Sequence, residues 1–145
     1  MVHTIGTHNG KFHCDEALAC FMLKRLDRFS KYSIVRSREH SVLEKCEILV
    51  DVGGVYDHSK KRYDHHQKGF AVTMDSLGFL ETTTKLSSAG LIYAHYGKQL
   101  IKEILGVSYD EKMIAIFFRK LYQTFIEAID AVDNGIKQYD GLPRF

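Results

Sequence analysis

The sequence predicts an α/β domain with a mainly parallel sheet flanked by helices. Strand-like apolar segments alternate with helical stretches through the first half of the chain, and this order of elements produces parallel sheets. The run Ile48-Leu49-Val50 is apolar at every position, which is typical of a strand buried on both faces of such a sheet. Helical patterns dominate the second half, and a length of 145 residues suits one domain over residues 1–145.

Four short strands are expected in the first half, at residues 2–7, 32–35, 48–52 and 62–64. Each is a short apolar or β-branched segment, and Gly53-Gly54 ends the third of them. Residues 67–86 contain two glycines and three consecutive threonines, so we expect this stretch to be irregular.

A first helix is predicted at residues 15–29. Its apolar residues recur at steps of three and four positions, as Leu18, Phe21, Met22 and Leu26. Asp15 and Glu16 stand in its first turn, where acidic side chains suit the helix dipole.

Two further helices are predicted from their end signals. One begins after Ser87, a good N-cap residue, and stops at Gly106. The other begins near Asp110 and stops near Asn134-Gly135, a good C-terminal signal.

The composition is that of an ordinary soluble globular protein, with 45% apolar and 26% charged residues. A net charge of +2 is too weak a bias to predict nucleic-acid binding by itself, although it permits an anionic substrate. Three cysteines without paired spacing argue against a disulfide framework and favour a reducing, intracellular compartment. No signal peptide and no membrane-spanning run is expected.

Histidines and aspartates concentrate in four short segments, at residues 8–16, Asp51, residues 64–66 and residues 130–135. In an open parallel sheet, ligands collect outside the carboxyl ends of the strands. His8 and His13 follow the first predicted strand, and Asp51 closes the third. The segments are therefore expected to face one crevice.

Asp51 is the most informative single residue of this set. A carboxylate after an apolar strand is costly to desolvate unless it is paired, hydrogen-bonded or bound to a metal. The alternative, an aspartate that serves the turn before Gly53-Gly54, carries about equal weight. Asp130 and Asp133 are three positions apart and can share a helix face, although a solvated face is the ordinary alternative.

Other candidate residues have ordinary structural explanations as well. Taken alone, His8 and His13 are more often loop histidines, and His65-His66 is more often a surface pair. Cys14 is expected to be a small buried residue and not a nucleophile. Four histidines without supporting context are expected to be structural or exposed, and these are His3, His40, His58 and His95. These structural explanations become less favoured when all four segments are expected to lie beside the same crevice.

The mixture of ligand types predicts the class of metal. Carboxylates with a few imidazoles and no paired cysteines argue against a cysteine-rich structural zinc site. Mn²⁺ or Mg²⁺ fits best, with Zn²⁺ or Co²⁺ as alternatives. Converging carboxylates repel one another unless divalent cations neutralise them, and two ions about 3.5–4 Å apart are a common arrangement for displacement at phosphorus.

Five ordered motifs resemble the melanocyte-proliferating-gene (Myg) family, and they lie at residues 5–17, 51–54, 63–67, 84–90 and 130–135. They cover nearly the whole chain and are far more specific than a lone Asp-His-His. That family looks like a branch of the DHH phosphoesterases. The resemblance implies a DHH-like N-terminal domain that hydrolyses phosphodiesters with metal-activated water. For the Myg branch it implies a manganese-dependent 3′-to-5′ exonuclease on RNA with mitochondrial and nuclear association.

The resemblance also implies roles for individual residues. The implied metal ligands are His8, His13, Asp15, Asp51, Asp64, His65 and either Asp130 or Asp133, with a preference for Asp133. His13 stands where the superfamily more usually has aspartate, and Asp51 is expected to bridge two ions. The implied catalytic residues are Asp64, as an orienting group or ligand, together with His65 and His66.

The motif at residues 84–90 is expected to hold a substrate phosphate. The candidates are Lys85, Ser87 and Ser88, which precede or begin a helix whose free N–H groups suit an anion. Helix capping is the favoured alternative for Ser87.

The expected partner is single-stranded RNA or another phosphodiester, with no membrane. A small-molecule phosphohydrolase acting on pyrophosphate or a dinucleotide is one alternative, and a non-catalytic, metal-stabilised binding module is another. The resemblance further implies a second, C-terminal domain that closes over the site. That domain is expected to be absent from residues 1–145, so half of the substrate cleft is expected to be missing from this chain.

Overall fold

The computed structural model describes residues 2–106, 110–137 and 140–141. Its centre is a five-stranded sheet in the order β2-β1-β3-β5-β4. The strands are β1 (Thr4–Thr7), β2 (Ser33–Arg36), β3 (Ile48–Val50), β4 (Tyr56–Asp57) and β5 (Arg62–Tyr63). All neighbouring pairs are parallel except β4 and β5, which are antiparallel. The predicted α/β class with a mainly parallel sheet is therefore confirmed.

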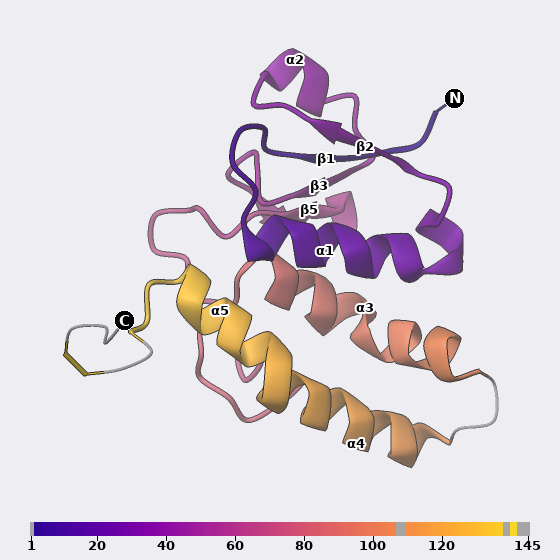
Figure 1. Cartoon of the computed structure of the whole chain (residues 1–145), viewed down its shortest axis with the longest axis vertical. Coiled ribbons are helices and arrows are strands. Elements are labelled where there is room, and N and C mark those ends of the chain that lie inside the picture. Colours follow the sequence, from indigo (N-terminus) through magenta and orange to yellow (C-terminus); the bar gives the residue numbers. More distant parts are fainter. Residues whose placement is uncertain (1, 107–109, 138–139, 142–145) are drawn as a thin grey trace.

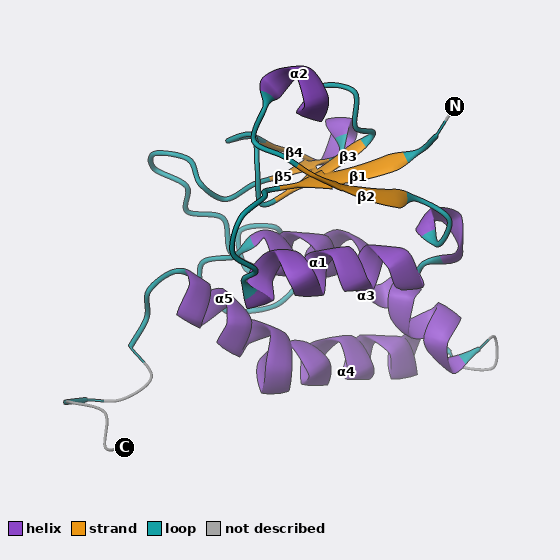
Figure 2. Cartoon of the chain, turned by 45° about the horizontal axis from the view of Figure 1, so that its top comes forward, coloured by secondary structure: helices purple, strands orange, loops and turns teal. Residues whose placement is uncertain are grey.

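Helices cover both faces of this sheet (Figure 1 and Figure 2). Helices α1 (Cys14–Arg25) and α3 (Ser88–Leu105) form the layer under the sheet, and α4 (Glu111–Leu121) and α5 (Glu127–Asp133) lie beneath them. The short α2 (His40–Leu43) lies on the opposite face. No helix in residues 2–106, 110–137 and 140–141 is long and apolar enough to cross a membrane.

The core lies between the sheet and the α1–α3 layer. Ile48 and Val50 of β3 are fully buried, as the unbroken apolar run predicts. Leu23 of α1 and Leu91 of α3 are fully buried in the same cluster. This packing fixes the first turns of α1 and α3 beside the carboxyl ends of the strands, where the candidate site lies.

The ends of several elements differ from the prediction. Helix α1 ends at Arg25 because Leu26 adopts an extended backbone, and a 3₁₀ turn follows at Asp27–Phe29. The Lys24 ammonium donates to the carbonyl oxygens of Ser30 and Tyr32, which stabilises this early exit. Strand β3 ends at Val50, since Asp51 has a positive φ of 54° that no regular strand contains.

The last predicted helix is interrupted by a π-helical turn at Tyr122–Ile126, which separates α4 from α5. The wider turn leaves both Tyr122 and Ile126 buried, and the Tyr122 hydroxyl donates to Asp130 at 2.7 Å. Helix α2, β4 and the 3₁₀ turn at His58–Lys60 are also absent from the prediction. Elements of two to four residues carry too little periodicity to be read from sequence.

Two of the four histidines that were expected to be structural or exposed, His58 and His95, stack on each other outside the candidate site. The rings of His58 and His95 lie 3.8 Å apart and nearly parallel, and the Tyr56 hydroxyl lies 2.7 Å from His95 Nε2. Burial, with a smaller contribution from His58, lowers the pKa of His95 from 6.5 to about 4. An unfolded chain therefore binds a proton at this histidine more readily than the folded protein does.

We expect His95 to destabilise the fold in acid. Because its pKa is lower in the folded state, its contribution to stability is lost as the pH falls from about 6.5 towards 4. With allowance for solvent screening, the loss should be about 1 kcal/mol. Urea unfolding at neutral and acidic pH should show a smaller acid penalty for His95→Gln than for wild type. His40 is exposed, so His40→Gln is the control. An equal acid-induced loss of unfolding free energy in wild type, His95→Gln and His40→Gln would contradict the role of His95.

Candidate metal-binding site

A cavity of about 1000 Å³ lies at the carboxyl ends of β1 and β3. The loop after β1, the first turn of α1 and the last turn of α5 meet there (Figure 1). The four predicted segments all contribute to its wall, with His8, His13, Asp15, Asp51, Asp64, His66 and Asp133 among the lining residues. The topology therefore brings residues from both ends of the chain to one crevice.

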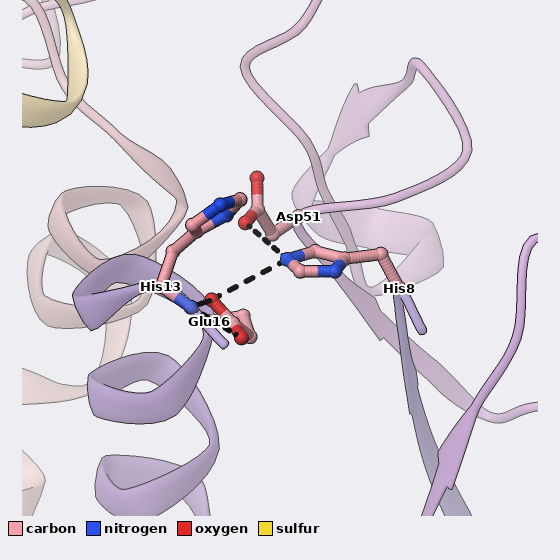
Figure 3. A group of neighbouring side chains, drawn as sticks. All are labelled: His8, His13, Glu16 and Asp51. Carbon is pink, nitrogen blue, oxygen red and sulfur yellow. Dashed lines mark hydrogen bonds and ion pairs between the residues drawn. The ribbon is translucent and has the colours of Figure 1, made fainter. Parts of the chain in front are cut away.

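A first candidate ligand group consists of His8, His13, Glu16 and Asp51 (Figure 3). One ligand atom from each residue lies within 4.8 Å of the other three. His8 Nε2 is 3.3 Å from a carboxylate oxygen of Glu16 and 3.3 Å from one of Asp51. The backbone N–H of His13 donates to the Glu16 carboxylate at 2.8 Å, which holds that side chain at the start of α1.

Two buried polar atoms in this group, His8 Nε2 and Asp51 Oδ1, have no hydrogen-bond partner among the residues that the structure describes. His8 Nδ1 lies 3.0 Å from the carbonyl oxygen of Asn9, which can only accept, so Nδ1 is the donor. In a neutral imidazole, Nε2 then presents a lone pair towards the carboxylates of Glu16 and Asp51. Such an arrangement is repulsive unless a cation lies between these atoms, so the residues present fit a divalent metal ion.

Two further candidate groups are connected to the first. One consists of Asp51, Asp64, His65 and His66, and the other of Asp15, His65 and Asp133. Asp51 belongs to the first and second groups, and His65 belongs to the second and third. His65 Nε2 lies 2.7 Å from Asp133. The three groups therefore form one continuous cluster with Asp51 near its middle.

Asp51 occupies an unusual environment in this cluster. Its backbone has a positive φ, which is uncommon outside glycine but tolerated by Asp and Asn. Burial, and then the charge of Asp15, raise the pKa of the Asp51 carboxyl to about 8. A carboxylate in this environment is stabilised when a cation neutralises it.

Asp64 orients the exposed histidine of the cluster. Its carboxylate accepts the backbone N–H groups of Gly54 at 2.7 Å and His66 at 3.0 Å, and it lies 2.8 Å from His66 Nδ1. The side chain of His66 is 63% exposed, whereas that of His65 is 5% exposed. His66 is thus the histidine of this pair that is open to the cavity.

The structure places the two candidate aspartates of the last motif, Asp130 and Asp133, in different environments. Asp130 is fully buried, and its carboxylate accepts hydrogen bonds from the Ser87 backbone and hydroxyl and from Tyr122. Burial raises the pKa of Asp130 to about 7. Asp133 belongs to a candidate ligand group, and Asp130 belongs to none in the part of the chain that the structure describes.

Asp15 differs from the other candidate ligands in its contacts. Its carboxylate accepts the backbone N–H groups of Ser88 at 3.1 Å and Ala89 at 2.6 Å, at the start of α3. Burial, and then the charge of Asp133, raise the pKa of Asp15. Asp15 therefore joins α1 to α3 and also faces His65 at 3.6 Å.

The three residues predicted to hold a substrate phosphate are not brought together in the cavity. Ser87 and Ser88 are fully buried. Ser87 caps α3 and donates to Asp130, while the Ser88 hydroxyl lies 3.1 Å from His65 Nδ1. Lys85 is exposed and does not line the cavity. These contacts favour the capping alternative for Ser87.

The sequence patterns did not identify one residue of the cluster and misplaced one residue of the cavity wall. Glu16 stands in the first turn of α1 as predicted, but it is also 2% exposed and belongs to the first ligand group, for which it was not a candidate. The spacing of three between His13 and Glu16, a helix start followed by an acid, is the signal that could have identified it. Cys14 is exposed and lines the cavity, so the expectation of a buried cysteine is wrong. The turn that buries Asp15 and Glu16 leaves its side chain outside.

Comparison with known proteins gives consistent matches over the whole chain. The family model MYG1_exonuc, described as an uncharacterised protein family (UPF0160), matches residues 4–145. The chain is 61% identical over 145 residues to MYG1 protein C27H6.8 of Caenorhabditis elegans, covering 100% of this chain and 43% of that protein. It is 52% identical over 143 residues to MYG1 exonuclease of Homo sapiens, covering 97% of this chain and 38% of that protein.

A more distant relative, MYG1 protein YER156C of Saccharomyces cerevisiae, is 46% identical over 139 residues. The alignment covers 96% of this chain and 40% of that protein. The chain thus spans about two fifths of the length of these curated relatives. No solved structure matches it significantly.

Proposed function

Because this chain belongs to the MYG1_exonuc family, we propose that it forms the metal-binding part of a phosphodiester hydrolase that shortens single-stranded RNA from its 3′ end. The observation that carries the proposal is the mostly buried cluster of histidines and carboxylates, in which His8 Nε2 and Asp51 Oδ1 have no hydrogen-bond partner within the described part of the chain. The name of the human relative, MYG1 exonuclease, supports a nuclease.

We propose that the cluster holds two divalent ions, with Mn²⁺ preferred because carboxylate and imidazole ligands are mixed. The proposed ligands are His8, His13, Glu16, Asp15, Asp51, His65 and Asp133. Asp51 is proposed to serve both ions, since it belongs to two ligand groups. When bound, such ions would supply a water of lowered pKa and neutralise negative charge at the phosphate.

The residues of the chain have separate tasks around such a phosphate. Asp64 keeps His66 in one orientation through its hydrogen bonds, and the Nδ1–H of His66 is directed at the Asp64 carboxylate. Only the protonated imidazole can therefore also donate, from Nε2, to a phosphate oxygen in the cavity. The two buried serines support residues behind the cavity wall. The Ser88 hydroxyl lies beside His65 Nδ1, and the Ser87 hydroxyl donates to the Asp130 carboxylate. This support restricts the movement of His65, which pre-organised sites require.

The test is hydrolysis of single-stranded RNA labelled at its 5′ end by the purified protein. With Mn²⁺ we expect a ladder of products shortened stepwise from the 3′ end, and with a chelator no products. Pyrophosphate and a dinucleotide are assayed in parallel. Hydrolysis of these small substrates alone would replace the nuclease with a small-molecule phosphohydrolase. Mn²⁺ binding without hydrolysis of any substrate would favour a metal-stabilised binding module.

A further inference from the structure

The loop between His8 and His13 contains residues that the metal cluster does not use. Phe12 is 73% exposed, more than any other phenylalanine that the structure describes. Both of its flanking segments are held in place, because Glu16 accepts the His13 N–H and Arg36 donates to the Gly10 carbonyl oxygen at 3.1 Å. An exposed aromatic ring on a well-anchored loop is available to bind a partner.

One face of the Phe12 ring is occupied by a cation. The Arg36 guanidinium carbon lies 3.6 Å from the ring centroid, and the same guanidinium lies 4.0 Å from the carboxylate of Glu16. The buried Nε of Arg36 has no hydrogen-bond partner in residues 2–106, 110–137 and 140–141. Arg36 therefore supports the ring from the side of the metal cluster, and the high exposure of Phe12 leaves the rest of the ring in solvent.

A second arginine links this loop to the cavity. Arg38 lines the cavity and donates to the Asn9 side-chain oxygen at 2.8 Å and to the Asn9 carbonyl oxygen. Within residues 2–106, 110–137 and 140–141, Arg38 forms no ion pair with a carboxylate. Together with the exposed Lys11, Arg36 and Arg38 place positive charge on a rim whose inner wall is rich in carboxylates.

We propose that Phe12, supported by Arg36, is a stacking platform for an unpaired nucleobase, and that Arg38 contacts the backbone phosphate between that base and the cavity. The proposal rests on the proposed nuclease function and names how its strand is held. Aromatic rings stack on every base, and arginine strengthens such sites by cation–π contact and by charge. A single-stranded nucleic acid carries both groups that this rim would bind, because its flat bases suit the Phe12 ring and its phosphates suit Arg38.

Kinetics of RNA hydrolysis test the platform. Phe12→Ala should raise KM about tenfold and change kcat by less than about twofold, because one stacked base is lost while the metal cluster is intact. Phe12→Tyr should restore the wild-type KM, since its ring can still stack. Phe21→Ala, which removes an exposed ring within α1 and outside the loop of Phe12, is the matched control. An unchanged KM for Phe12→Ala, or an equal rise for Phe21→Ala, would overturn the platform.

A binding measurement separates this inference from the nuclease proposal. The chain contains no tryptophan, so Phe12→Trp introduces a single tryptophan at the platform, and its fluorescence can be excited selectively over that of the tyrosines. A short single-stranded oligonucleotide should quench this fluorescence, and an abasic strand of the same length should not. Equal responses to both strands, or none to either, would exclude base stacking at Phe12. Quenching does not require hydrolysis. If the protein showed this quenching but hydrolysed no RNA, the nuclease proposal would be refuted and the stacking proposal would be retained.

Discussion

Asp51→Asn is expected to lower metal-dependent hydrolysis by about a thousandfold, which corresponds to about 4 kcal/mol of activation free energy. Asp51 belongs to two of the three candidate ligand groups, so its loss affects both proposed ions. Asparagine has the same shape and tolerates the positive φ of 54° at this position. The substitution therefore removes a charge and leaves the backbone unstrained.

Thermal unfolding distinguishes loss of metal from loss of fold in this variant. In wild type, Mn²⁺ should raise Tm, because an ion that binds only the folded protein stabilises it. In Asp51→Asn this rise should be largely absent, while the Tm of the metal-free protein should be equal or higher, since one buried carboxylate is removed from among several. Elemental analysis should find fewer ions per chain than in wild type.

Asp75→Asn is the matched control, because Asp75 is exposed and does not belong to the ligand groups. It should keep the activity, the metal content and the Tm shift of wild type. If Asp51→Asn retained full activity with unchanged metal content, the central role of Asp51 would be refuted.

Asp130→Ala and Asp133→Ala are expected to affect different properties, the first mainly the stability of the fold and the second mainly metal affinity. Asp130→Ala should lower the free energy of unfolding by about 3–5 kcal/mol, because the Ser87 N–H and hydroxyl and the Tyr122 hydroxyl all lose their buried acceptor. Asp133→Ala should cost less than about 1 kcal/mol, because the loss of its contact with His65 is offset by removing its repulsion of the buried Asp15. Metal affinity should fall mainly in Asp133→Ala, since Asp133 pairs with His65.

A third variant tests the Asp130 network without removing the aspartate. A Cβ at Gly90 would lie 2.2 Å from Asp130 Oδ1, so Gly90→Ala should displace the carboxylate and destabilise the protein much as Asp130→Ala does. Urea unfolding and Mn²⁺ titration on all three variants give the comparison. If Asp133→Ala were the strongly destabilised variant and Asp130→Ala lost only metal, the assignment of the two residues would be reversed.

Local patterns in the sequence were enough for the fold class and for most helix and strand positions. The apolar run at residues 48–50, the N-cap residues Ser87 and Asp110, and the stop at Gly106 all act through neighbours close in the chain. The location of the site at the carboxyl ends of the strands also followed, because parallel strands bring their ends to one edge. Ordered motifs were likewise enough to identify the family.

Only the tertiary structure decided which side chains of these motifs turn inward. Glu16 is buried and Cys14 exposed, although both stand in the first turn of α1. Asp130 binds Ser87 and Tyr122, whereas Asp133 reaches His65 from one turn further along the same helix. Arg36 supports Phe12 from a different strand. These outcomes depend on contacts between residues far apart in sequence. A local spacing such as that of His13 and Glu16 can indicate a helix start, but it does not show which distant residue a side chain will contact.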